Sequence, residues 1–127
     1  MISKNVLLDS SVWIEILSDG PLVEACKKEL AASTVIVPTV VIYEVYKKIT
    51  SSTSEDRGLS AIALLSQYMV TDLSSEIALH AADLSLLHKL GMADSLVLAH
   101  AQQSHAKLVT LDNDFAKIEN VQVIRRS

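Results

Sequence analysis

Short apolar runs alternate with longer amphipathic stretches along the chain. The runs predict strands at residues 6–8, 34–37, 70–73, 107–111 and 121–124. Most of them are continuously apolar rather than alternating, which is typical of strands that are covered on both faces of a parallel sheet. The pattern therefore predicts an α/β fold, a three-layer sandwich in which helices flank a central parallel sheet of four to five strands.

Helices are predicted where apolar positions recur every three or four residues. These stretches span residues 12–17, 22–32, 39–49, 59–69, 76–90 and 93–104. Ser10 and Ser11 are candidate caps for the first helix, and Thr39 is one for the third. Gly91 is the expected residue just beyond the fifth helix. The polar stretch 51–57 is expected to be a loop.

The length and composition suit one compact unit. A chain of 127 residues fits a single domain over residues 1–127, and 50% hydrophobic with only 4% aromatic residues predicts a core of Leu, Val, Ile and Ala. We see no secretion signal and no apolar run that could span a membrane, so we expect a cytoplasmic protein. The lone cysteine, Cys26, is expected to be a half-buried packing residue.

The net charge of −4 counts mildly against a nucleic-acid binder, because such proteins are more often basic. Carboxylates in a metal site would explain an acidic balance, since bound cations offset them. The basic residues also occur in pairs, at Lys27-Lys28, Lys47-Lys48 and Arg125-Arg126. We expect each pair to be an ordinary solvated surface feature.

Five acidic residues fall where the predicted fold places functional sites. The carboxyl ends of parallel strands meet at one edge of the sheet. Asp9 follows the first strand directly, and Asp112 follows the fourth, with Asp114 two residues on. Glu44 lies about one turn into the helix after the second strand, and Asp94 lies in the first turn of its own helix. We expect these side chains to approach one another.

Three of these acidic residues also have an ordinary structural interpretation. Asp94 could simply begin a helix, and Asp112 could begin a turn. Glu44 could pair with Lys47 or Lys48 at helical spacing. Asp9 and Glu44 are harder to explain in this way, because each lies in an apolar stretch and a buried, isolated charge is costly unless it is paired or bound to metal.

Converging carboxylates repel one another, and a metal ion relieves that repulsion. Ligand sets made only of oxygen suit Mg²⁺ or Mn²⁺ rather than zinc. Such ions lower the pKa of bound water and stabilise the leaving oxygen during attack on phosphorus. The acidic residues therefore favour phosphodiester hydrolysis.

Other chemistries lack their motifs. The four histidines form no HExxH pattern, and we expect all of them at the surface or its boundary: His80, His88, His100 and His105. A haloacid-dehalogenase-like phosphatase would need Asp-x-Asp, but the chain has Asp9-Ser10-Ser11. A receiver domain would have only Asp72 as its phosphoacceptor, and no suitable lysine follows Thr110. Glycine-rich nucleotide loops and serine-hydrolase elbows are absent from the sequence.

Four short motifs, in this order, resemble those of the PIN domain family, and specifically of the VapC toxins of toxin–antitoxin pairs. They are Leu8-Asp9-Ser10-Ser11 at the end of a strand, Val37-Pro38 before a helix that carries Glu44, the segment 93–99 with Asp94 near its start, and Leu108-Val109-Thr110-Leu111-Asp112-Asn113-Asp114-Phe115. Each motif is weak alone, but together they cover almost the whole chain.

The resemblance implies an endoribonuclease that depends on Mg²⁺ or Mn²⁺. It implies a catalytic, metal-holding set of Asp9, Glu44, Asp94 and Asp112, with Asp114 as a further ligand or an alternate to Asp112, and with Ser11 and Thr110 as hydrogen-bonding supports. It also implies an RNA substrate, a homodimer and a cognate VapB-type antitoxin. Helices 22–32 and 59–69 are candidate partner surfaces. The alternative is a PIN-like module that binds RNA or protein without cutting it.

Overall fold

Five parallel strands form the centre of the molecule in the computed structural model, which describes residues 5–125. Their order across the sheet is β3-β2-β1-β4-β5, and every neighbouring pair is parallel. The strands are β1 (Asn5–Leu8), β2 (Thr34–Pro38), β3 (Met69–Thr71), β4 (Lys107–Thr110) and β5 (Val121–Val123). The predicted α/β fold with a parallel sheet of four to five strands is confirmed.

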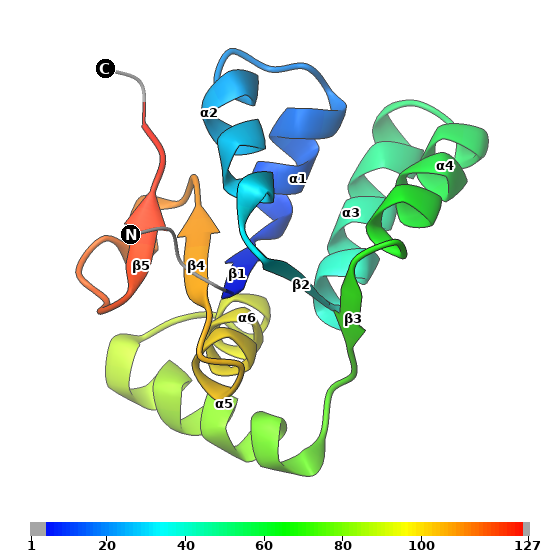
Figure 1. Cartoon of the computed structure of the whole chain (residues 1–127). Coiled ribbons are helices and arrows are strands. Elements are labelled where there is room, and N and C mark those ends of the chain that lie inside the picture. Colours follow the sequence, from blue (N-terminus) through cyan, green and yellow to red (C-terminus); the bar gives the residue numbers. More distant parts are fainter. Residues whose placement is uncertain (1–4, 126–127) are drawn as a thin grey trace.

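Helices cover the sheet on both faces. They are α1 (Ser10–Leu17), α2 (Val23–Lys27), α3 (Thr39–Ser52), α4 (Glu55–Leu65), α5 (Ser75–His88) and α6 (Met92–Gln103), with 3₁₀ turns η1 (Lys28–Ala31) and η2 (Asn113–Phe115). The chain moves one way along the sheet from β1 to β3 and the other way from β3 to β4. Right-handed crossovers therefore place α1–α4 on one face and the α5–α6 pair on the other (Figure 1).

The core explains the continuous apolar runs. Leu7 and Leu108, on adjacent central strands, are fully buried. Trp13 of α1 is fully buried too, and its ring packs against Tyr68 with centroids 5.4 Å apart. The edge strand β3 differs, since its Met69 is 54% exposed. The adjacent strands β1 and β4 are thus the most closely packed part of the sheet.

Several helices begin at residues other than those that the sequence predicts. Asp9, and not Ser10 or Ser11, caps α1 by accepting a hydrogen bond from the Ser10 amide. Helix α4 begins at Glu55, inside the predicted loop 51–57, because Ser54 accepts a hydrogen bond from the Arg57 amide. Thr39 is the first residue of α3 rather than its cap, since Pro38 holds that position.

The end of α5 also differs from the prediction. Lys89, with a φ of 57°, takes the left-handed position that was expected of Gly91. The Ser85 hydroxyl donates to the Leu90 carbonyl and so helps to close the helix before Leu90. Gly91 instead precedes α6 as its N-cap residue. A local hydrogen bond, five residues in span, thus accompanies a helix end at Lys89 rather than at the glycine that favours this conformation.

Two further expectations concern single features. Cys26 is fully buried rather than half-buried, and burial raises the pKa of its thiol to about 11, so it is a packing residue. The predicted helix 22–32 divides at Lys28, where α2 gives way to η1. Within residues 5–125, no helix is both long enough and apolar enough to cross a membrane. Of the pair Arg125-Arg126, the second residue lies outside the described residues.

Candidate functional site

Asp9 forms the floor of a carboxylate cluster at the carboxyl edge of the sheet. Its side chain is only 4% exposed. The Ser10 amide donates to Oδ1 at 2.8 Å, while the hydroxyls of Thr110 and Ser11 donate to Oδ2 at 2.7 and 3.2 Å. Because three donors hold both oxygens, the carboxylate has one orientation, set by the ends of two adjacent strands.

The two supporting hydroxyls also fix the segment that follows β4. The Thr110 hydroxyl accepts a hydrogen bond from the Asp112 amide at 3.0 Å, and the Ser11 hydroxyl accepts one from the Leu111 amide at 3.1 Å. Ser11 and Thr110 themselves lie 3.4 Å apart, oxygen to oxygen. The turn that carries Asp112 is therefore tied to the start of α1, so Asp9 and Asp112 keep a fixed relation.

The rim of the cluster consists of Asp94, Asp112 and Asp114. Each offers a carboxylate oxygen, and these oxygens lie within 4.8 Å of one another. Asp112 also has the structural role foreseen for it, since its Oδ1 accepts a hydrogen bond from the Asp114 amide at 2.9 Å and caps η2. Asp94 lies in the first turn of α6 but does not cap it, because Gly91 holds that position.

Glu44 approaches from α3 and is partly buried. Its carboxylate interacts with the charges of Asp9 and Asp94 and receives a hydrogen bond from the Ser10 side chain. The salt bridge to Lys47 or Lys48 does not form. Across the described residues the one ion pair joins Lys107 to Glu29, at 2.9 Å. The structure thus brings Glu44 together with the other carboxylates, and no lysine or arginine between residues 5 and 125 forms an ion pair with them.

The electrostatics of the cluster follow from burial and mutual repulsion. Burial, and then the charges of Asp9, Asp112 and Asp114, raises the pKa of Asp94 to about 6. Burial and the charge of Asp9 raise the pKa of Glu44. Burial also raises the pKa of Asp9, although its hydrogen bonds act in the opposite direction. The site is a concentrated negative charge that favours a cation.

The donors suit a hard divalent cation. The oxygens of Asp94, Asp112 and Asp114 are close enough to surround one ion, and no histidine or cysteine belongs to their group. Ligand sets of this kind fit Mg²⁺ or Mn²⁺ better than zinc. The chemistry of the residues present therefore agrees with the metal that the sequence motifs imply.

The structure gives two residues a role or a position that the sequence does not predict. Ser10 was considered only as a helix cap, yet its amide binds Asp9 and its side chain binds Glu44. His100 was expected near the surface but is 1% exposed, since α5 and the sheet enclose α6. Its Nδ1 lies 3.3 Å from the Thr71 hydroxyl, and burial lowers its pKa. The apolar neighbours Leu98 and Ala101 were the available signal of this burial.

A parallel α/β sheet that gathers several carboxylates at its carboxyl edge defines a class of domain with an acidic site. Comparison with known proteins makes this class specific. Residues 6–121 match the PIN domain, and the chain belongs to the PIN domain family. The resemblance that the motifs indicated is confirmed. PIN nucleases generally use divalent metals, as the acidic rim would suggest.

Solved structures share the whole fold. A toxin–antitoxin complex from Klebsiella pneumoniae contains a chain of 27% identity, with a TM-score of 0.76 over 91% of this chain and 94% of that one. The sarcin–ricin-loop-cleaving VapC toxin of Mycobacterium tuberculosis is 16% identical, with a TM-score of 0.78 over 93% and 98% of the two chains. A VapBC complex from Rickettsia felis, bound to a promoter DNA fragment, is 20% identical with a TM-score of 0.75 over 94% and 97%. A search of curated proteins gave no match.

Proposed function

We propose that this protein is a metal-dependent endoribonuclease that hydrolyses RNA phosphodiester bonds. The observation that carries the proposal is the convergence of Asp94, Asp112 and Asp114 with Asp9 and Glu44, without a neutralising lysine or arginine among residues 5–125. A cluster of this charge is unfavourable for folding alone, so its retention favours a role in binding a cation.

Each residue has a role that follows from its contacts. Asp94, Asp112, Asp114, Asp9 and Glu44 would hold Mg²⁺ or Mn²⁺. When bound, the metal supplies a water of lowered pKa and stabilises charge on the phosphate. Ser11 and Thr110 would fix the orientation of Asp9 through the hydrogen bonds described above. Such support from hydroxyls keeps ligand oxygens in place as substrate enters.

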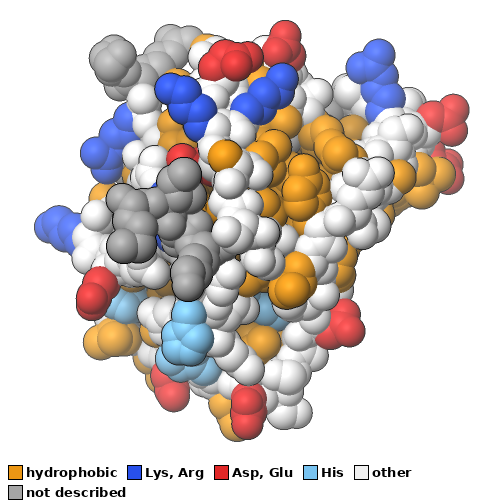
Figure 2. All heavy atoms as spheres, viewed as in Figure 1, with side chains coloured by type: hydrophobic (Ala, Val, Ile, Leu, Met, Phe, Trp, Pro, Cys, Tyr) orange, Lys and Arg blue, Asp and Glu red, His pale blue; other side chains and the backbone are white. Residues whose placement is uncertain are grey.

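We further propose that the protein acts in the cytoplasm as a homodimer that a VapB-type antitoxin inhibits. The similar chains from Klebsiella pneumoniae and Rickettsia felis were solved in toxin–antitoxin complexes. This chain has a groove of about 690 Å³ between α1 and the α3–α4 pair, where apolar side chains gather (Figure 2). Ile14, Leu17, Ile49 and Ala61 line it. Of the two candidate partner helices, only α4 contributes to this groove.

The test of the nuclease is a cleavage assay on structured RNA with Mn²⁺, with and without EDTA. We expect cleavage that needs the metal and disappears in Asp9→Asn. RNA that binds but is not cut under any metal condition would favour the non-cleaving module instead. The partner is tested separately, by co-purification with the product of an adjacent short reading frame.

A further inference from the structure

The outer surface of α3 carries aromatic and basic side chains directly beside Glu44. A shallow pocket of about 260 Å³ is lined there by Tyr43, Glu44, Lys47, Lys48 and Ser51. Residues three, four and seven positions after Glu44 share one side of a helix, and each turn rises about 5.4 Å. The pocket therefore starts at the acidic site and runs away from it for about two turns of α3.

Tyr43 is an exposed aromatic side chain that the core does not use. Its exposed fraction is 62%, whereas the core-facing residues of α3, Val41 and Val45, are fully buried. The Lys47 ammonium lies 5.6 Å from the centre of the Tyr43 ring and 3.5 Å from its hydroxyl. The ring thus offers an exposed, flat apolar surface next to a positive charge.

Lys48 adds a positive charge that nothing in the described part of the chain neutralises. Its side chain is exposed, and it takes part in no ion pair or side-chain hydrogen bond within residues 5–125. The lysine pair of α3 stands out because the protein is acidic overall, with a net charge of −4. A cationic spot beside an acidic cluster would attract a polyanion at the point where a metal could hold its phosphate.

We propose that Tyr43, Lys47, Lys48 and Ser51, here called the α3 platform, bind the nucleotide of a single-stranded RNA next to the bond that is cut. The base stacks on Tyr43, and the adjoining phosphate contacts Lys48. This inference deepens the proposed nuclease function and rests on it for the position of the cut. An aromatic ring with neighbouring ammonium groups is the combination that non-specific single-strand binders use.

The test measures binding separately from cleavage. A fluorescein-labelled single-stranded RNA of mixed sequence, and an abasic strand of equal length, are titrated with the protein in the Asp9→Asn background at several salt concentrations. Tyr43→Ala is expected to weaken RNA binding at least about fivefold and to leave the abasic strand unaffected, while Tyr43→Phe retains binding. Lys48→Gln is expected to weaken the binding of both strands. It should also make binding less dependent on salt concentration, by an amount that corresponds to about one phosphate contact.

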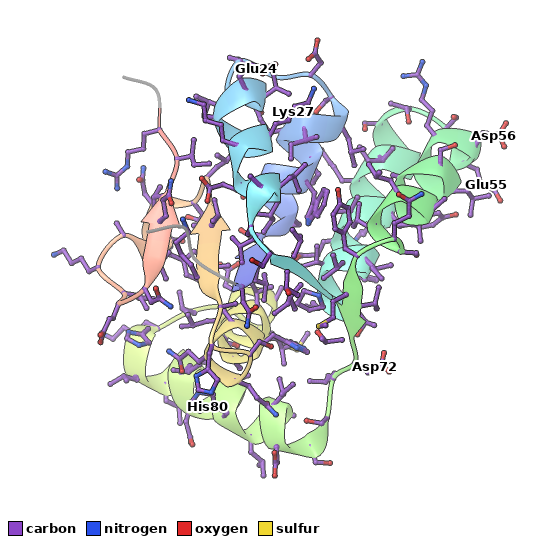
Figure 3. All side chains as sticks on the ribbon, viewed as in Figure 1. Glu24, Lys27, Glu55, Asp56, Asp72 and His80 are labelled. Atoms are coloured by element: carbon purple, nitrogen blue, oxygen red, sulfur yellow. The ribbon has the colours of Figure 1, made fainter. Side chains whose placement is uncertain are left out.

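The matched control is Lys27→Gln, which removes the same charge from an exposed lysine on α2 (Figure 3). Binding that survives Tyr43→Ala, or that falls equally with Lys27→Gln and Lys48→Gln, overturns the platform. If the unmodified protein cuts RNA in that case, the nuclease proposal still holds. If it cuts no RNA while binding depends on Tyr43 and Lys48, the platform stands and the nuclease proposal fails. Loss of protein–protein association without loss of RNA binding in Tyr43→Ala also overturns the platform.

Discussion

The floor and the rim of the acidic site differ in how the fold treats a carboxylate. At the floor, Asp9 is 4% exposed and accepts hydrogen bonds from Ser10, Ser11 and Thr110. At the rim, Asp94 is partly exposed, accepts no side-chain or capping hydrogen bond within the described residues, and interacts with four other carboxylates. The hydrogen bonds of the floor therefore offset part of the cost of burying the charge of Asp9, whereas Asp94 has no such donors and its charge is left for another group to offset.

This difference separates two tasks within one site. The floor ties β1 to β4 and gives the site its shape, since Thr110 bonds both Asp9 and the Asp112 amide. The carboxylates of the rim repel one another, and a bound cation would relieve that repulsion. Removing a hydroxyl donor of the floor should therefore lower stability, whereas rim variants should disturb metal binding and relieve repulsion in the metal-free protein.

The largest expected effect is a loss of RNA cleavage, which we expect from variants of both the floor and the rim. We predict that Asp9→Asn and Asp94→Asn each lower metal-dependent RNA cleavage by at least about 100-fold, because losing a ligand removes several kcal/mol of electrostatic stabilisation. The measurement is the initial rate of cleavage with Mn²⁺ at equal concentrations of folded protein. Substantial cleavage by Asp94→Asn would remove that residue from the proposed metal site.

The next effect belongs to the floor alone. Thr110→Val is predicted to destabilise the protein by about 1–3 kcal/mol, because it leaves the buried Asp9 oxygen and the Asp112 amide short of a partner. Thr110→Ser keeps the hydroxyl and is the matched control. Urea denaturation followed by circular dichroism gives both free energies of unfolding. Stability that is retained in Thr110→Val but lost in Thr110→Ser would mean that the methyl group, and not the hydrogen bonds, matters at this position.

The same contrast shows how much could be predicted from the sequence. The strands were predictable because their apolar runs are covered on both faces, and Asp9 and Asp112 were placed at one edge because parallel strands end there. The clustering of Glu44 with Asp9 followed from the same topology. These inferences depend on sheet geometry, which the pattern of buried residues largely determines.

What could not be predicted depends on tertiary contacts. The burial of His100 results from packing around α6, and its ring nitrogen lies near Thr71, which is distant in the sequence. From the sequence, the lysines of the α3 platform are predicted to be an ordinary solvated pair. The exposure of Tyr43 and the position of Lys47 over its ring are properties of the fold, so the sequence does not reveal them. Side-chain partners distant in sequence leave little trace in periodicity.

A smaller effect is expected at the rim, where a variant should raise the stability of the protein rather than lower it. Without metal at neutral pH, Asp94→Asn is predicted to stabilise the protein, because it removes one charge from a repelling group. Solvent screening of this partly exposed side chain limits the gain to about 1 kcal/mol, or a few degrees in Tm. Asp83→Asn on the exposed face of α5 is the control and should leave Tm nearly unchanged. Added Mn²⁺ should raise Tm more for the unmodified protein than for Asp94→Asn.

The smallest effect is the pH dependence of that same difference. Folding raises the pKa of Asp94 from 3.8 to about 6, so the folded protein holds this proton more tightly than the unfolded chain does. Its contribution to stability is fully present below pH 3.8 and is lost as the pH rises through about 6. The Asp94→Asn variant lacks this contribution, while the other titrating groups, including His100 with its lowered pKa, remain in both proteins. The gain in stability from Asp94→Asn should therefore grow between pH 4 and about pH 6 and level off above it, as urea denaturation in EDTA at successive pH values would measure. A gain that is constant across this range would mean that Asp94 titrates normally. The contrast between the hydrogen-bonded carboxylate of the floor and the repelled carboxylate of the rim would then be lost.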